Sequence, residues 1–135
     1  MTTARSTAKQ FIQRIETLDF LEAFRMLAPD GHYIVIGTTA ASRTYRGRQD
    51  LFDNLIPVLA TFKEPPKLKF QEPIVEGDRA VLLANGKGLG PTGPYEQPYY
   101  AFITRVKGNE FAEIIEFADT VMIETGIFGN KLVKA

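Results

Sequence analysis

The chain has 135 residues, of which 44% are hydrophobic and 24% are charged, a balance typical of a globular protein with a buried core. Its 16 basic and 16 acidic side chains cancel, so the sequence carries no electrostatic signal for binding nucleic acid or an acidic membrane. The absence of cysteine excludes disulfides, thiol nucleophiles and cysteine metal sites, and the single histidine, His32, excludes a multi-histidine metal site within one chain.

The sequence contains no targeting or membrane signal. No stretch reaches the ~18–20 apolar residues of a membrane span, and the polar N-terminal segment lacks the apolar centre of a signal peptide. Together with the lack of cysteine, these features predict a cytoplasmic protein. No repeat or linker interrupts the chain, so we expect one domain covering residues 1–135.

The first half of the chain predicts three helices, spanning residues 3–18, 19–27 and 48–62. The first repeats apolar residues at helical spacing, and the second begins with the capping-box sequence DFLE at Asp19. Pro57 lies inside the third and should kink or end it, because proline removes one backbone hydrogen bond. Between the second and third helices, "HYIVIG" predicts a strand and "TYRG" a short edge strand.

The second half predicts strands over residues 67–76, 80–90, 95–106 and 110–124, after a break at "KEPPK". The last segment carries an acid at every third position, which also fits an amphipathic helix with a solvated acidic stripe. The preceding "RVKGNEF" is a hairpin signal, with glycine in a short polar turn between two apolar runs. This signal favours a strand, in which two of the four acids face inward.

This order of elements resembles the NTF2-like superfamily, and most of all its SnoaL-like and ketosteroid-isomerase-like members. The resemblance is carried by "AFRMLAPDGHYIVIG", "YRGRQDLFDNL" and "FITRVKGNEFAEIIEFAD", while "GKGLGPTGPYEQPYYAFITR" is similar to phenazine-biosynthesis members. It implies an α+β fold: a cone in which three N-terminal helices pack in a curved, mostly antiparallel sheet around a deep apolar pocket. It also implies a homodimer through the outer sheet face, a small-molecule ligand, no standing cofactor or metal, and acid–base chemistry.

The residue set of ketosteroid isomerases is absent. Those enzymes use a tyrosine, an aspartate base and a protonated aspartate, and the matching places here hold Phe11, Val35 and about Tyr100. Without the base, this chain cannot isomerise steroids by that mechanism. Tyr100 remains as a phenolic hydrogen-bond donor, or as part of the pocket wall.

The same alignment places Glu113 in the pocket and makes it the candidate proton carrier, with Tyr100 as the donor. The residues expected to bind the ligand are Phe11, Tyr33, Val35, Phe102, Ile115, Phe117 and Asp119. Burial should raise the pKa of Glu113 and suit it to proton transfer. Two alternatives stay open: a structural glutamate hydrogen-bonded to Tyr100 or to a basic partner such as Lys87 or Arg105, or a β-bulge near residues 114–115 that turns Glu116 inward instead.

Three functions fit these features. The first is a small acid–base enzyme of the isomerase, cyclase or dehydratase type, acting on a small apolar or ring-shaped substrate. The second is a non-catalytic ligand-binding protein, and the third is a protein-interaction module. The three arginines of "RTYRGR" fit a solvated helix entry or an anion-binding rim, and "GKGLGPTGP" does not match a nucleotide fingerprint.

Overall fold

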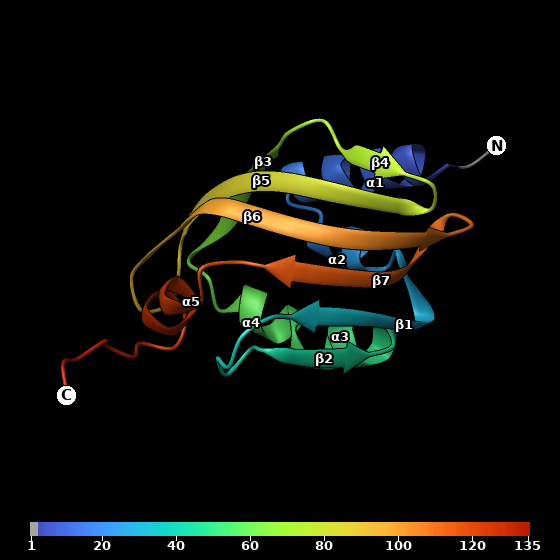
Figure 1. Ribbon diagram of the computed structural model, residues 1–135. Helices are drawn as coiled ribbons and strands as arrows, with labels where there is room; N and C mark the ends of the chain where they lie inside the picture. The colour runs from blue at the N-terminus through green and yellow to red at the C-terminus, as the bar shows by residue number, and fades with distance from the viewer. Residues whose placement is uncertain (1–2) are drawn as a thin grey trace.

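The computed structural model describes residues 3–135, and in this part of the chain seven strands form one curved sheet. The elements are α1 (Ala4–Glu16), α2 (Phe20–Phe24), β1 (Leu27–Val35), β2 (Arg43–Arg46), α3 (Arg48–Asn54), α4 (Ile56–Ala60), β3 (Glu64–Phe70), β4 (Ile74–Glu76), β5 (Arg79–Leu89), β6 (Pro94–Lys107), β7 (Glu110–Phe117) and α5 (Thr120–Gly126). Figure 1 shows the sheet in front of α1 to α4, with α5 at one end.

The strand order is β2-β1-β7-β6-β5-β3, and β4 pairs with β5 beside β3. Only β1 and β7 run parallel, and every other pair in the described chain is antiparallel. The expected α+β fold with a curved, mostly antiparallel sheet is therefore confirmed. The core lies between the helices and the concave face, where fully buried aromatic rings such as Phe11 and Phe111 meet edge to face at 5.3 Å.

The helices differ from the sequence expectation in two places. The third expected helix is divided at Leu55 into α3 and α4, because Pro57 has no N–H for the i−4 bond and instead occupies the first turn of α4. The expected capping box of the second helix does not form: Asp19 makes no side-chain cap bond, and Glu22 pairs with Arg25 at 3.1 Å.

Several strand boundaries also differ. β1 begins at Leu27, the last residue of the expected second helix, and the strand expected over residues 67–76 is divided into β3 and β4. β3 begins at Glu64 and includes both prolines of "KEPPK", which was expected to be a break. An edge strand tolerates proline because the missing N–H can face solvent rather than a neighbouring strand, and β3 lies at the end of the sheet. The last strand ends at Phe117, so the expected strand over residues 110–124 is wrong in its second part, which forms α5.

Helix α5 is fixed at both ends. At its start, the carboxylate of Asp119 accepts hydrogen bonds from the amides of Val121 (3.0 Å) and Met122 (3.4 Å), the usual N-cap arrangement. At its end, a Cβ on Gly90 would lie 2.2 Å from the carbonyl oxygen of Gly126, so a glycine is required for the loop to pack this closely. None of the helices in residues 3–135 is long and apolar enough to cross a membrane.

Candidate functional site

A cavity of about 70 Å³ lies between the concave face of the sheet and the helices. Nineteen residues line it, of which eight are aromatic: Phe11, Phe20, Phe24, Tyr33, Phe62, Tyr95, Tyr100 and Phe102. Most of the others are aliphatic, and they include Ile123 of α5 and Ile127, which follows α5 directly. A mostly apolar wall with a few polar groups is typical of small-molecule sites, although the volume is well below the ~300–1,000 Å³ of drug-sized pockets.

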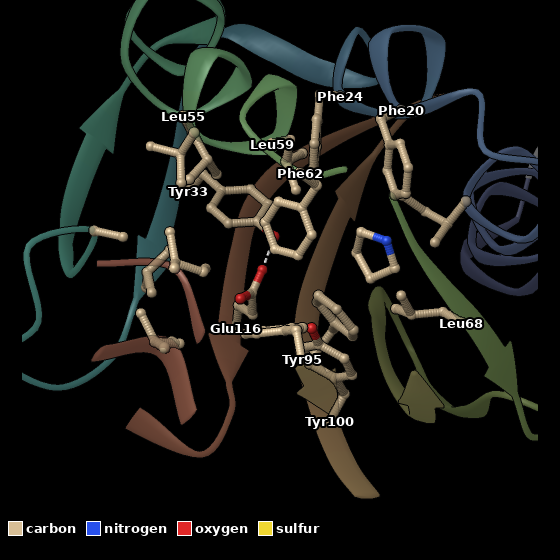
Figure 2. Close-up of a pocket in the computed structure, with 18 of the residues that line it drawn as sticks. Phe20, Phe24, Tyr33, Leu55, Leu59, Phe62, Leu68, Tyr95, Tyr100 and Glu116 are labelled. Atoms are coloured by element: carbon tan, nitrogen blue, oxygen red, sulfur yellow. Dashed lines mark hydrogen bonds between the residues drawn. The ribbon is translucent and has the colours of Figure 1, made fainter. Parts of the chain in front are cut away.

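The carboxyl group in this wall belongs to Glu116 on β7 (Figure 2). The neighbouring strand β1 brings Tyr33 beside it, and the hydroxyl of Tyr33 donates a hydrogen bond to Oε1 of Glu116. Protein surrounds both groups: Tyr33 is fully buried, and Glu116 keeps only intermediate exposure on the cavity side of the sheet. Oε2 of Glu116 makes no hydrogen bond to any residue in 3–135.

Burial controls the protonation of this pair. It raises the pKa of Glu116, and the hydrogen bond from Tyr33 lowers that pKa in part. Burial, and then the negative charge of Glu116, hold the pKa of Tyr33 well above its usual value, so the shared proton stays on the tyrosine. No lysine, arginine or histidine among the described lining residues compensates the carboxylate.

A pair of phenols forms the second polar part of the wall. The hydroxyl of Tyr100 donates to the hydroxyl of Tyr95 at 3.3 Å, and Nε2 of Gln97 donates to the same Tyr95 oxygen at 3.1 Å. Because the two phenols share a single hydrogen bond, one of their two protons has no acceptor in residues 3–135. Burial raises the pKa of Tyr95 to about 12 and that of Tyr100 well above its usual value, so both are neutral donors at neutral pH.

Gln97 connects the phenols to the start of α5. Its side chain is fully buried, and Nε2 donates to the backbone oxygen of Asp119 at 2.9 Å while Oε1 accepts from the backbone amide of Asp119 at 2.7 Å. All hydrogen-bonding groups of the amide are thereby used, which fixes both Tyr95 and the end of β7.

Comparison with known proteins rests on structure alone. No model of a known protein family matches the sequence, and no curated protein matches it. An NTF2-like protein from Burkholderia thailandensis is similar with a TM-score of 0.81, at 18% identity over 93% of this chain and 98% of that chain. The chain has the NTF2-like fold.

Two further structures carry the other resemblances. A protein from Jannaschia sp., assigned as a SnoaL-like polyketide cyclase, matches with a TM-score of 0.70 at 15% identity over 97% of this chain and 98% of that chain. A protein from Catenulispora acidiphila with a ketosteroid-isomerase-like fold, in complex with trimethylamine, matches with a TM-score of 0.71 at 18% identity over 94% and 95%. At these identities the likeness establishes the NTF2-like fold and not an activity.

Five of the residues predicted for the site line the NTF2-like cavity: Phe11, Tyr33, Val35, Tyr100 and Phe102. Their roles in ligand binding or catalysis remain predictions. His32 has the opposite strand parity to Tyr33 and is not a cavity residue.

The expected orientation of Glu113, Ile115 and Phe117 is wrong. Glu113 and Ile115 lie on the convex face of the sheet, next to Arg105 of β6, and Phe117 is 40% exposed. The cause is a β-bulge: Val106 and Arg105 pair with Phe111 and Glu113, so the intervening residue of β7 has no partner. The bulge reverses the parity of the strand after Phe111, and Glu116 takes the inward place.

The expectation that Asp119 lies on the pocket face of the last strand is also wrong. It is not among the cavity residues, because β7 has already ended and its carboxylate caps α5. Two polar groups of the site, Tyr95 and Gln97, were not singled out from the sequence. Tyr95 and Tyr100 are five residues apart and would face opposite sides of a regular strand, but an irregularity in the β5–β6 pairing between Gln97 and Tyr100 turns both inward.

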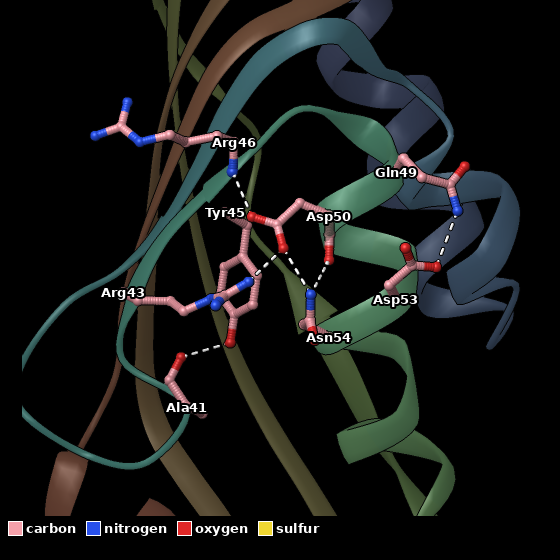
Figure 3. A network of polar contacts seen from close by, with 8 residues as sticks. All are labelled: Ala41, Arg43, Tyr45, Arg46, Gln49, Asp50, Asp53 and Asn54. Atoms are coloured by element: carbon pink, nitrogen blue, oxygen red, sulfur yellow. Dashed lines mark hydrogen bonds and ion pairs between the residues drawn. The ribbon is translucent and has the colours of Figure 1, made fainter.

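Two of the three arginines near β2, Arg43 and Arg48, have their guanidinium groups in ion pairs, whereas the guanidinium of Arg46 points away from the network (Figure 3). Arg43 pairs with Asp50 and lies over the ring of Tyr45 at 4.4 Å, and the amide of Arg46 donates to Asp50 at 2.8 Å. Arg48 of α3 pairs with Glu110 of β7 at 2.7 Å. These contacts fasten α3 to β2 and β7. No cluster of three or more potential metal-ligating side chains occurs in residues 3–135.

Proposed function

We propose that the protein binds a small apolar or ring-shaped organic molecule in the cavity and performs acid–base chemistry on it, of the isomerase, cyclase or dehydratase type. The observation that carries this proposal is the carboxyl group of Glu116, which is buried without a basic partner and has a raised pKa. A carboxyl that titrates closer to neutrality is a better general base and acid at physiological pH. Two structural neighbours, one assigned as a SnoaL-like polyketide cyclase and one in complex with trimethylamine, also support a function that involves a small molecule.

Each polar group of the cavity has a separate role in this chemistry. Glu116, as carboxylate, takes a proton from the bound molecule and returns it at another atom. Tyr33 holds the carboxylate in one orientation through its hydrogen bond. The phenolic proton of the Tyr95–Tyr100 pair that has no acceptor is the donor for negative charge developing on a substrate oxygen.

Proton exchange offers a test that needs no knowledge of the natural substrate. Cyclohexanone in heavy water exchanges its α protons slowly, and a buried base beside a phenolic donor should accelerate this exchange, followed by proton NMR. We expect Glu116→Gln to reduce the protein-dependent rate by about 100-fold, the usual scale of general-base catalysis. Glu113→Gln, the same change on the convex face, is the matched control and should keep the full rate.

If the Glu116→Gln variant keeps the exchange rate of the wild type, Glu116 is not the base. Absence of any protein-dependent exchange would favour the second function, a ligand-binding protein without catalysis. The small volume and the few polar groups of the cavity are the observations that favour this alternative. In either function a ring-shaped molecule requires the aromatic wall to move apart, since about 70 Å³ holds only a few non-hydrogen atoms.

We also propose that the protein forms a homodimer through the convex face. Ile34, Ile115 and Ile103 are cross-strand neighbours on β1, β7 and β6 and form an apolar row there. A charged row that includes Glu113 and Arg105 runs beside it. Self-complementary packing of an apolar row bordered by both charges is typical of two-fold interfaces.

A further inference from the structure

The described residues of the cavity wall include an acidic side chain but no basic one. Among its nineteen described lining residues, Glu116 is the only carboxylic acid, and none is a lysine, arginine or histidine. A buried carboxylate is normally paired with a cation or hydrogen-bonded at both oxygens. Here Tyr33 satisfies Oε1, while Oε2 has no partner in residues 3–135. The negative charge of Glu116 therefore lacks a counter-ion that the protein itself could supply.

Aromatic rings surround the same carboxyl group. Figure 2 shows Tyr33 and Phe62 on one side of Glu116 and Tyr95 and Tyr100 on the other. Phe62 meets Tyr95 edge to face, with centroids 5.2 Å apart and ring planes at 85°. Edge-to-face rings do not cover each other's faces fully, and the negative face of an aromatic ring attracts cations, most strongly where water is excluded.

We propose that this cavity also binds a small methylated amine, held as its ammonium ion against Oε2 of Glu116 and the surrounding aromatic rings. Methyl groups suit the apolar walls, and the positive charge supplies the missing counter-ion. Carboxylates and phosphates are excluded, because they would face Glu116 with no basic group to compensate them. The volume of about 70 Å³ limits the ligand to a few non-hydrogen atoms unless the walls move.

Binding of the ammonium ion is coupled to a proton. When Glu116 is neutral in the free protein, the ammonium ion displaces its proton to solvent and leaves a carboxylate–ammonium pair; when the amine enters uncharged, it takes that proton itself. The other titratable groups in the cavity wall are Tyr33 on β1 and Tyr95 and Tyr100 on β6, and Tyr45 on β2, outside this wall, is also close enough for the charge of Glu116 to raise its pKa. The cavity residues from α1, α2, α4, β3 and α5 are not titratable. Proton release should therefore come from Glu116 alone and decrease as the pH rises.

Tetramethylammonium chloride is the probe, because its charge does not depend on pH. tert-Butanol, with the same number of non-hydrogen atoms, is its neutral counterpart. Isothermal titration calorimetry of the wild type should give a dissociation constant at least about tenfold lower for tetramethylammonium than for tert-butanol. Titration in two buffers of different ionisation enthalpy should show proton release that diminishes towards alkaline pH.

Glu116→Gln should remove the preference for the cation and the proton release while leaving tert-butanol binding unchanged, and Glu113→Gln should change neither. Equal binding of the two probes, a preference that survives Glu116→Gln, or no binding of either probe at tens of millimolar overturns the proposal. The proton-release measurement uses the wild type, so it stands even if the variant folds poorly. The inference rests on the same cavity as the proposed function but needs no turnover: loss of ketone exchange with retained cation preference contradicts only the proposed catalysis, and the reverse contradicts only the ligand class.

Discussion

Replacing Glu116 by glutamine should change how the free energy of unfolding depends on pH. In the folded protein, burial raises the pKa of Glu116, whereas in the unfolded chain a glutamate titrates near ~4.3. Between these two values the folded state holds more protons than the unfolded state. The stability that the neutral carboxyl contributes is therefore complete below the unfolded pKa and is lost as the pH rises through the folded pKa, by up to ~1.4 kcal/mol per pH unit.

Glutamine cannot ionise, so this loss is absent from the variant. Its amide oxygen can still accept the hydrogen bond from Tyr33, and we expect a cost of about 1 kcal/mol at acid pH for the altered packing and hydrogen bonding. As the pH rises, the variant should gain steadily in stability relative to the wild type.

Urea unfolding followed by far-UV circular dichroism measures this difference, since the chain contains no tryptophan for fluorescence. The range from about pH 4.5 to about pH 8.5 spans the expected change. Glu113→Gln removes the same charge from the convex face and controls for the change in net charge. If the difference between wild type and Glu116→Gln stays constant over this range, the carboxyl is not titrating in a buried site, and the reasoning fails.

Three further changes test other parts of the structure. Tyr33→Phe removes the hydrogen bond that favours the charged form of Glu116, so carbon NMR should show the pKa of this carboxyl rising further; a lower or unchanged value would contradict the assigned hydrogen bond. Gln97→Met loses three buried hydrogen bonds and should destabilise the fold by about 2–4 kcal/mol in urea unfolding, whereas Gln71→Met at an exposed position should have little effect. Ile115→Glu should convert the proposed dimer to a monomer in sedimentation at tens of micromolar, and a wild-type protein that sediments as a 15.1 kDa monomer would remove the dimer proposal altogether.

Most of the fold could be predicted from the sequence, because the apolar periodicity of the helices and the hairpin signal before β7 are local features. The parity of β7 could not. A single unpaired residue beside Phe111 moved the inward carboxyl from Glu113 to Glu116. Such a bulge depends on the fit of β7 between two neighbouring strands, and the sequence of β7 alone gives no sign of its position.

The sequence after β7 contains two competing local signals, one for a helix and one for a strand. Asp119 followed by a threonine is a good helix N-cap sequence, but the β-branched residues after it favour a strand. Packing decided between the two: α5 places Ile123 in the cavity wall, and Gln97 of β6 binds the backbone at Asp119. Tyr95 joined the site for a similar reason, since an irregularity between strands turned it inward.

The titration of the Glu116 carboxyl is the most direct test of the claim that this group is buried without a basic partner. Carbon NMR of protein labelled at the glutamate side-chain carboxyls, with Glu116→Gln to assign the signal, follows this group alone through a pH series. The cavity geometry predicts that its pKa lies above the ordinary range of glutamate, because burial without a basic partner outweighs the hydrogen bond from Tyr33. A titration near the ordinary value of ~4.3 would mean that the carboxylate is solvated, and would contradict both the proton-carrier role and the proton release expected on cation binding.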